Sequence, residues 1–260
     1  MENLDFPLIG SITEETVKKA HERLLNIAVV IRDILERHNI KYIIMFGTLL
    51  GSIRHKGFVP WDLDMDIGII EEEYTEAMEF VKSELPEWLV VQDSETDRNY
   101  CAFWSKIVDR TSVIHVTAYD GDNRFDYKGL HIDLYKLKRT SRENYEYNRQ
   151  KDCILYYNEQ LKRGLLTREQ YEEKTRPIED QLNKTNLKDV KNDCYYFIYM
   201  FCSEEYNIFP VKDYEFCGEI FKGPCNYDKV LKDSYYTGDY MVPPPYEKRD
   251  LKMDSIRFLE

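Results

Sequence analysis

The sequence predicts an α/β (α+β) fold in which helices flank a mixed β-sheet, with a helical insertion and an irregular C-terminal segment. Over residues 1–139, short apolar runs of strand length alternate with stretches of helical periodicity. Residues 140–205 are charged and helical in pattern, whereas residues 206–260 are rich in proline, glycine and tyrosine. We therefore expect a core, a helical region and a C-terminal segment that packs back on the core.

A long amphipathic helix is expected over residues 11–39. Ser11 and Glu14 have the spacing of a capping box, and the apolar residues that follow recur at helical intervals. The next stretch, KYIIMF at 41–46, has the length and apolarity of a strand. It is followed by GTLLGSIR at 47–54, which predicts a glycine turn and then a short helix.

Further strands are expected from alternating or apolar runs. Residues 62–70, DLDMDIGII, alternate acids with apolar residues, which is typical of a strand with one polar and one buried face. A helix is expected over 72–83. The remaining strand candidates are residues 88–92, 101–108, 112–119 and 130–137.

The second half of the chain has a different pattern. Residues 140–191 are expected to form two helices separated at Gly164, and the aromatic-rich residues 192–203 are expected to form a core helix. From Phe209 onward the composition predicts irregular structure wrapped on another part of the molecule.

Composition and charge limit the classes of function. The formal net charge is −12 at pH 7, which repels polyanions and argues against sequence-independent binding of nucleic acid. No apolar run approaches the roughly 20 residues of a transmembrane helix. The first residues, MENLDFPLIG, lack the basic and apolar regions of a signal peptide. We therefore expect a cytoplasmic protein, either free or peripheral at the inner face of the membrane.

The six cysteines fit a reducing compartment, because disulfide frameworks are typical of smaller secreted chains. The spacing from Cys194 to Cys202 repeats from Cys217 to Cys225, so a four-thiolate zinc site is an alternative to buried thiols. The 21 tyrosines allow an aromatic cage for a quaternary ammonium, although most are expected to be core or surface residues.

Asp62, Asp64 and Asp66 alternate directly before an apolar run, where the repulsion of like charges costs stability. On one strand, Asp64 and Asp66 project from the same face at roughly 7 Å. Such a pair can chelate a divalent cation through oxygen ligands, and Mg²⁺ or Mn²⁺ suits a site that combines carboxylates with substrate phosphates. Without a cation, this repulsion raises the pKa of a carboxyl group. The run therefore predicts a cation site.

The residues between the first strand and the acid run suit phosphate binding. A glycine turn at Gly47 lets backbone N–H groups at a helix start face a phosphate, and Thr48 adds a hydroxyl donor. Arg54, His55 and Lys56 occupy the following loop, where they can bind phosphate oxygens or neutralise a leaving group.

Three later residues complete the candidate site. Asp133 is an acid set singly between apolar residues on a strand, and it is the candidate third carboxylate of a two-metal site. Lys106 is a candidate phosphate contact on another strand, and Asp239 in the tail is a candidate cap of the site. A solvated strand lysine and a structural turn are the alternatives for these two residues.

The combination of strand, glycine turn, short helix and DxD resembles the nucleotidyltransferase-fold signature. The longer string GTLLGSIRHKGFVPWDLDMDIGI at 47–69 resembles the LicD family, which includes bacterial phosphocholine transferases and has fukutin and fukutin-related protein among its relatives. Residues 94–114, GLHIDLYKL at 129–137 and the tail at 221–249 are similar to further stretches of that family.

The resemblance implies a nucleotidyltransferase-like catalytic core over residues 1–139. It also implies that Asp64 and Asp66 are the family's metal-binding DxD and that Asp133 is its third acid. The phosphate-side positions fall on Gly47 and Thr48, and the loop bases fall on Arg54 and Lys56. The chain departs from the family pattern at Leu63, at Phe216-Cys217 and in the tail sequence YTGD, which puts recognition of the acceptor or the base in doubt.

The implied activity is a metal-dependent transfer of a phospho-alcohol group from a CDP-activated donor, with release of CMP. Phosphocholine from CDP-choline is the first expectation, and ribitol phosphate or glycerol phosphate could be transferred in its place. The expected acceptor is a hydroxyl of a cell-surface glycan or its precursor, such as lipopolysaccharide or teichoic acid, either free or lipid-linked. Two different functions stay open: a nucleotidyltransferase that uses an NTP and releases pyrophosphate, and a non-catalytic binding protein with the same scaffold.

Overall fold

The structure is a computed structural model of the 260-residue chain. It describes residues 12–116, 124–198, 200–235, 239–249, 251 and 253–259. The expected cap Ser11 and the last part of the strand expected over 112–119 lie outside the described residues. Two of the tyrosines considered for an aromatic cage, Tyr199 and Tyr236, also lie outside them.

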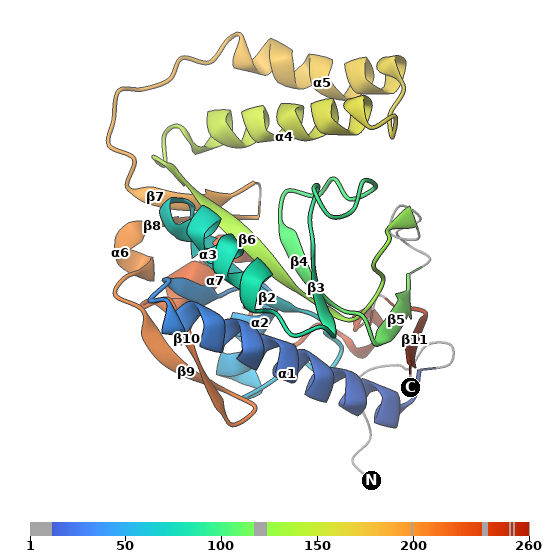
Figure 1. The fold of residues 1–260 in the computed structure, drawn as a ribbon. Coiled ribbons are helices and arrows are strands. Elements are labelled where there is room, and N and C mark those ends of the chain that lie inside the picture. The colour runs from blue at the N-terminus through green and yellow to red at the C-terminus, as the bar shows by residue number, and fades with distance from the viewer. Residues whose placement is uncertain are drawn as a thin grey trace.

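A mixed sheet forms the centre of the fold, as the sequence predicts (Figure 1). Strand β2 runs parallel to β6, while β1 pairs with β2, and β4 with β6 and β3, in antiparallel fashion. Along the sheet the order is β1 (Tyr42–Ile44), β2 (Met65–Ile70), β6 (His131–Thr140), β4 (Ser105–Asp109) and β3 (Leu89–Gln92). Because β2 and β6 are central, β2 is buried along its whole length, and β6 is buried on both faces from Ile132 to Tyr135.

Helices α1 (Glu14–Arg37) and α3 (Glu71–Glu84) pack together against the sheet (Figure 1). Helix α1 begins one turn later than expected, because Thr13 is its N-cap and accepts a hydrogen bond from the Thr16 N–H at 3.1 Å. Its apolar residues at helical spacing, including Leu24, Ile27 and Ile31, are completely buried. The short helix α2 (Phe46–Arg54) follows β1, as the sequence predicts, and packs against β2.

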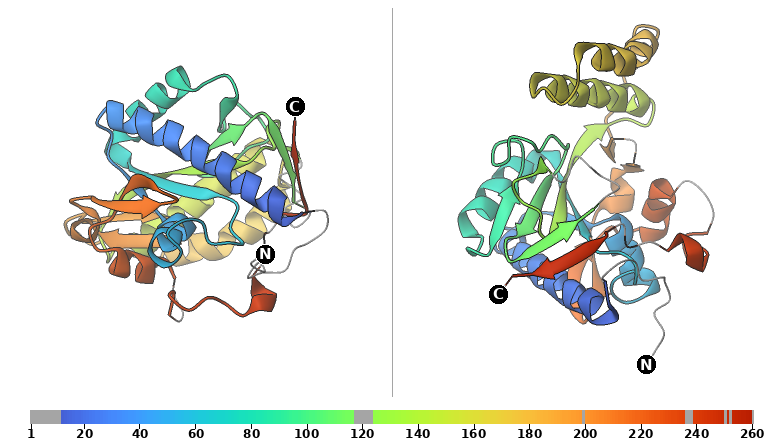
Figure 2. Two further views of the ribbon diagram at one scale, coloured as in Figure 1. Left: turned by 90° about the horizontal axis from the view of Figure 1, so that it is seen from below. Right: turned by 90° about the vertical axis from the view of Figure 1, so that its right-hand side faces the viewer.

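The helical region contains α4 (Tyr145–Lys162) and α5 (Arg168–Leu182), which lie side by side and extend beyond the sheet (Figures 1 and 2). Gly164, at a φ of +70°, follows α4 and supplies the left-handed turn between them.

The expectation of a core helix over residues 192–203 is wrong. These residues form a β-hairpin of β7 (Cys194–Phe197) and β8 (Phe201–Glu204), and β7 pairs with the end of β6. The run Cys194–Phe197 is buried throughout, so its apolar pattern is compatible with either element, and pairing with β6 decides for the strand.

The C-terminal region is more regular than the sequence indicates. Its elements are α6 (Glu205–Ile208), β9 (Lys212–Phe216), β10 (Glu219–Gly223), α7 (Tyr227–Ser234), the 3-10 helix η2 (Tyr246–Lys248) and β11 (Ser255–Phe258). Strand β10 packs beside β1, and β11 pairs with β5 (Ser112–His115), which returns the end of the chain to the side of the core (Figure 2). These pairings are non-local, which is why a composition rich in proline and glycine does not reveal them.

All six cysteines are free thiols. In the part of the chain that the structure describes, which includes every cysteine, no group of three or more cysteine, histidine or acidic side chains is arranged to hold a metal by itself, so the four-thiolate zinc site has no structural support. Among the described helices, none is long and apolar enough to span a bilayer.

Candidate active site

Four polar side chains form one row across the sheet. The register pairs Asp66 on β2 with Asp133 on β6, Asp133 with Lys106 on β4, and Lys106 with Gln92 on β3. All four residues are buried, the two aspartates at 6% exposure each. Polar groups are seldom buried in this way without partners, because desolvation costs several kcal/mol. The row therefore marks a site with a purpose other than packing.

The two aspartates share one hydroxyl group. Tyr135 Oη lies 2.9 Å from Asp66 Oδ1 and 3.1 Å from Asp133 Oδ2, and the single hydroxyl proton can serve one of them at a time. The Asp66 backbone N–H donates to Thr48 Oγ1 at 2.7 Å, which ties the start of β2 to helix α2. The Thr48 hydroxyl oxygen therefore accepts a hydrogen bond from β2, the strand that carries Asp66.

Both carboxyl groups have perturbed pKa values. Burial, followed by the charges of Asp64 and Asp133, raises the pKa of Asp66 well above its ordinary value. Burial also raises the pKa of Asp133, against the opposing effects of Lys106 and Tyr135. Two buried carboxylates that both resist ionisation form a site that favours a shared proton or a bound cation.

A divalent cation fits this pair. Asp133 Oδ1 is buried and has no hydrogen-bond partner among the described residues, so one oxygen of the pair is available as a ligand. Asp64 is half-buried and close enough to raise the pKa of Asp66. No three such side chains enclose an ion by themselves in the described ranges, and Mg²⁺ sites commonly use one or two carboxylates together with substrate phosphates.

Asp62 and Asp64 do not lie on the strand on which the sequence places them. Strand β2 begins at Met65, so both residues belong to the approach to it. We call Asp62, Asp64, Asp66 and Asp133 the acid cluster. Asp66 and Asp133, which lie on two paired strands, form its rigid part. The parallel pairing of β2 with β6 that brings these two residues together cannot be predicted from the alternation of the acid run itself.

Gly47 allows Asp62 to approach the start of helix α2. A Cβ atom at position 47 would lie 2.1 Å from Asp62 Oδ2 and 3.7 Å from Asp66 Oδ2. Met45, the N-cap residue of this helix, makes no side-chain hydrogen bond to the first N–H groups of α2. The glycine thus makes space for a carboxylate and a ligand beside the helix start.

Lys106 is held inside the sheet rather than exposed on it. Its Nζ lies 3.0 Å from His131 Nε2, and His131 Nδ1 lies 3.1 Å from the Gly129 carbonyl oxygen. Because the ammonium can only donate and the carbonyl can only accept, Nδ1 carries the imidazole proton. Burial and the Lys106 charge lower the pKa of His131 to about 3, so the ring is neutral. Lys106 is thus the buried positive charge opposite Asp133.

The three basic residues expected in the loop line two different cavities. Arg54 lines a cavity of about 760 Å³ that also contains Gly47 and Asp62. His55 and Lys56 line a different hollow of about 470 Å³ against α1. His55 also packs edge-on against Trp61, with ring centroids 6.2 Å apart, whereas the exposed Lys56 is not among the residues around the acid pair.

The C-terminal region supplies the other wall of the larger cavity. Asp239 lies there, with its Oδ1 accepting from the Met241 N–H at 2.9 Å. The wall also contains Tyr240. The residues of this wall that the sequence does not single out as site residues are Trp61, Tyr235, Val242, the prolines 243–245 and Lys248. The charges of Asp66, Asp62 and Asp64 act on Tyr235, which places its hydroxyl beside the acid cluster. The similarity of the tail to a family signature is the one signal in the sequence for these residues.

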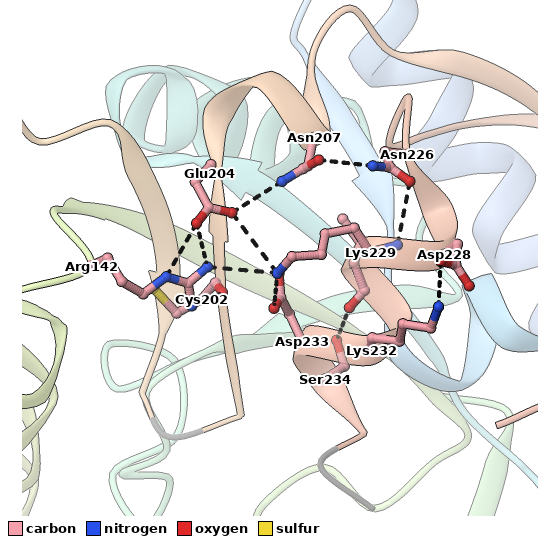
Figure 3. Close-up of polar contacts among 11 residues, drawn as sticks. Arg142, Cys202, Glu204, Asn207, Asn226, Asp228, Lys229, Lys232, Asp233 and Ser234 are labelled. Carbon is pink, nitrogen blue, oxygen red and sulfur yellow. Dashed lines mark hydrogen bonds and ion pairs between the residues drawn. The ribbon is translucent and has the colours of Figure 1, made fainter. Parts of the chain in front are cut away.

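A polar network holds helix α7, which ends directly before Tyr235, in place (Figure 3). Arg142 donates to Glu204 Oε1 at 2.8 Å and to the Cys202 carbonyl oxygen at 2.9 Å. Lys229 on α7 pairs with Asp233 on the same helix and lies 4.0 Å from Glu204. Helix α7 is thereby joined to β8, and its position fixes the residue that follows its C-terminus.

Comparison with known proteins identifies the segment that carries this site. The family model described as LicD/FKTN/FKRP, nucleotidyltransferase domain, matches residues 39–162. The lipopolysaccharide cholinephosphotransferase LicD of Haemophilus influenzae is 42% identical over 59 residues, which are 23% of this chain and 22% of that protein. An uncharacterized protein of Rickettsia prowazekii is 41% identical over 69 residues, which are 24% of this chain and 26% of that protein.

The aligned stretches thus span 22% and 26% of the length of these two relatives. The matched segment 39–162 includes α2, the acid run, Lys106 and Asp133, which are the elements that build the acid cluster. Over this segment the chain is similar to the LicD family.

Proposed function

We propose that this protein transfers a phospho-alcohol group, phosphocholine in the first place, from a CDP-activated donor to a hydroxyl group of a glycan and releases CMP. The observation that carries the proposal is the buried, register-matched pair Asp66 and Asp133 beside a cavity lined by Arg54. The similarity to a lipopolysaccharide cholinephosphotransferase supports the choice of phosphocholine. The acceptor glycan is free or lipid-linked.

Asp66 and Asp133 would hold Mg²⁺ or Mn²⁺ together with phosphate oxygens of the donor, with Asp64 at the edge of the site, and the ion when bound would neutralise charge on the diphosphate. Tyr135 orients the two buried carboxylates, and Lys106 compensates the charge of Asp133 from the neighbouring strand. Gly47 leaves room for the donor beside the uncapped start of α2.

In the proposed reaction, the acceptor oxygen forms a bond to the phosphorus of the transferred group. The bond from that phosphorus to the bridging oxygen breaks, and CMP leaves with the electron pair. A carboxylate of the acid cluster accepts the proton of the acceptor hydroxyl. Arg54 stabilises the charge that develops on the leaving phosphate.

The test is release of CMP from CDP-choline in the presence of Mg²⁺ and candidate glycans. Asp66→Asn and Asp133→Asn should each abolish release, and full activity in either variant would refute the site. CDP-ribitol and CDP-glycerol test whether ribitol phosphate or glycerol phosphate is transferred. The family model also describes a nucleotidyltransferase domain, so release of pyrophosphate from an NTP would favour nucleotide transfer instead. Failure to bind Mg²⁺ and every cytidine nucleotide in calorimetry would favour a non-catalytic binding protein.

A further inference from the structure

Two guanidinium groups lie against the indole ring of Trp61, a residue that lines the larger cavity. The Arg54 Cζ is 5.9 Å from the centroid of the Trp61 ring, and the Arg249 Cζ is 5.0 Å from it. Backbone carbonyls hold both groups in place, since Arg54 donates to the Tyr240 oxygen at 2.6 Å and Arg249 donates to the Pro244 oxygen at 2.8 Å. Three distant parts of the chain meet here: the end of α2, the approach to β2 and the tail.

This arrangement concentrates positive charge in a protein whose net charge is −12. Burial lowers the pKa of Arg54, Tyr235 raises it, and the Arg249 charge lowers it further, so the two guanidiniums repel one another. Lys248 adds a third cation to the wall of the same cavity. Like charges held together at a cost are stabilised when an anion binds between them. The cationic group of Arg54, Lys248 and Arg249 around Trp61 is hereafter called the arginine-indole cluster.

Arg54, Trp61 and Lys248 of the arginine-indole cluster line the same cavity as Gly47 and Asp62. This cavity reaches the acid pair at Gly47, where a Cβ atom would lie 3.7 Å from Asp66 Oδ2. Tyr235 lies between the two clusters, because its pKa is raised by burial and by the charges of Asp66, Asp62 and Asp64, and is lowered by the Arg54 charge. The cavity that joins Gly47 and Asp62 to Arg54 and Trp61 has a volume of about 760 Å³, which is in the range of small-molecule sites. A ligand with two adjacent phosphates suits one cationic end and one metal-binding end.

The use of Trp61 also excludes one assignment. A quaternary ammonium requires an aromatic face that no other cation covers. Since Arg54 and Arg249 both lie against the Trp61 ring, this indole serves anion binding and is unsuited to the choline end of a donor.

We infer that the arginine-indole cluster, with Arg249 from the tail as its decisive member, is an anion subsite for the leaving phosphate of a diphosphate donor. The inference rests on the proposed function for the direction of the donor: the transferred phosphate lies at the acid cluster, and the leaving phosphate lies at the arginines. When the bond to the bridging oxygen breaks, the electron pair stays on the leaving oxygen, and the negative charge grows next to the guanidiniums. Arg249 and Lys248 thus bind the phosphate that leaves with CMP.

The experiment measures binding of inorganic pyrophosphate and of CMP by calorimetry in Mg²⁺, with no acceptor present. Arg249→Met should weaken both by about tenfold or more, the loss expected for a charge-assisted contact, and Arg249→Lys should retain part of the affinity. The matched control is Arg257→Met, an exposed arginine of the same tail on β11, which should bind like wild type. Unchanged binding in a folded Arg249→Met variant overturns the inference.

Choline chloride serves as the second probe. It should not compete with pyrophosphate, and competition that Arg249→Met enhances would make Trp61 a choline site and overturn the inference. The two proposals fail separately. If pyrophosphate binding depends on Arg249 but CDP-choline yields no CMP, the subsite stands and the proposed donor falls. If Arg249→Met releases CMP with unchanged kcat and KM, the subsite falls and the transferase stands.

Discussion

Asp66 and Asp133 are register partners on adjacent parallel strands, and the hydroxyl of Tyr135 lies within 3.1 Å of a carboxylate oxygen of each. Their closeness is a property of the sheet, since neither residue can leave the other without breaking the pairing of β2 with β6. The acid cluster is therefore rigid where the proposed cation would bind, and its repulsion is a cost that the fold carries without a ligand.

The first prediction concerns this cost. Asp133→Asn removes one of two buried like charges and keeps a polar group of the same shape for Tyr135. In metal-free solution the variant should be as stable as wild type or more stable by about 1 kcal/mol, because desolvation of a charge is avoided. The stabilisation of the wild type by Mg²⁺, measured as a rise in Tm, should be lost in the variant.

Asp152→Asn is the matched control for that measurement. Asp152 is also buried at 6% exposure, but it is paired with Lys138 at 2.7 Å and accepts from Tyr196 at 2.9 Å. The same substitution should destabilise the protein there and leave the Mg²⁺ effect intact. Equal behaviour of the two variants would show that Asp133 is an ordinary paired carboxylate.

The second prediction concerns Gly47. Gly47→Ala places a methyl group 2.1 Å from the present position of Asp62 Oδ2, so the carboxylate must move. Unfolding in urea should show a loss of about 1–3 kcal/mol, as for other insertions into packed sites. Asp62→Ala on the Gly47→Ala background removes the clash and should recover most of the loss. Additive effects of the two substitutions would contradict the contact.

The third prediction is a dependence of stability on pH. His21 stacks on Phe58 with centroids 4.2 Å apart, and its Nε2 lies 2.8 Å from the Asp62 carbonyl oxygen. Burial lowers the pKa of His21 to about 4. Between that value and its ordinary pKa of 6.5, the unfolded chain binds the proton and the folded one does not, so stability falls as the pH is lowered through this window.

His21→Gln keeps an N–H donor for Asp62 and removes the titration. The free energy of unfolding of wild type minus that of the variant should therefore decrease by about 2 kcal/mol from pH 7 to pH 4.5. His131, with its pKa lowered to about 3, adds a slope of the same sign in both proteins and cancels in the difference. A difference that is flat with pH would show that His21 titrates normally.

The fourth prediction concerns the seating of α7. Arg142→Met removes the contacts to Glu204 and Cys202 that join this part of the structure, and it should cost about 1–2 kcal/mol of stability. Amide hydrogens of α7 should exchange faster in the variant. Arg168→Met on α5 breaks an exposed pair with Glu172, so it should leave both the stability and the exchange of α7 as in wild type. If the amide hydrogens of α7 stay protected in both variants, the polar network around Arg142 does not fix the position of α7 or of Tyr235.

The sequence predicts the parts of the fold that depend on local periodicity. The alternation around Asp66 and Asp133 places both acids on strands, and a short helix follows β1 where the sequence indicates one. The glycine turn expected at residue 47 is wrong, because Gly47 is the second residue of α2. The alternation does not tell where a strand begins, so Asp64 falls outside β2. It also does not tell which strands are neighbours, so the position of Lys106 opposite Asp133 could not be predicted.

Long-range contacts account for the remaining differences. The buried run Cys194–Phe197 becomes a strand because β6 offers it an edge, which no local propensity reveals. Trp61 is recognisable in the sequence as an anchor, but the two arginines that lie against it come from the end of α2 and from the tail. The contact of these two arginines with Trp61 depends on how the C-terminal region folds back onto the core. The path of that region cannot be predicted from residue types alone.

The register at the end of β6 has a wider consequence. Thr140, where β6 ends, is the direct partner of Cys194, where β7 begins, so the two helices between them leave and rejoin the sheet at a single rung. A segment attached in this way can be lengthened, shortened or replaced without shifting Asp133 along its strand. The helical hairpin is therefore a module whose length can change while the rung that fixes the register of β6 stays the same.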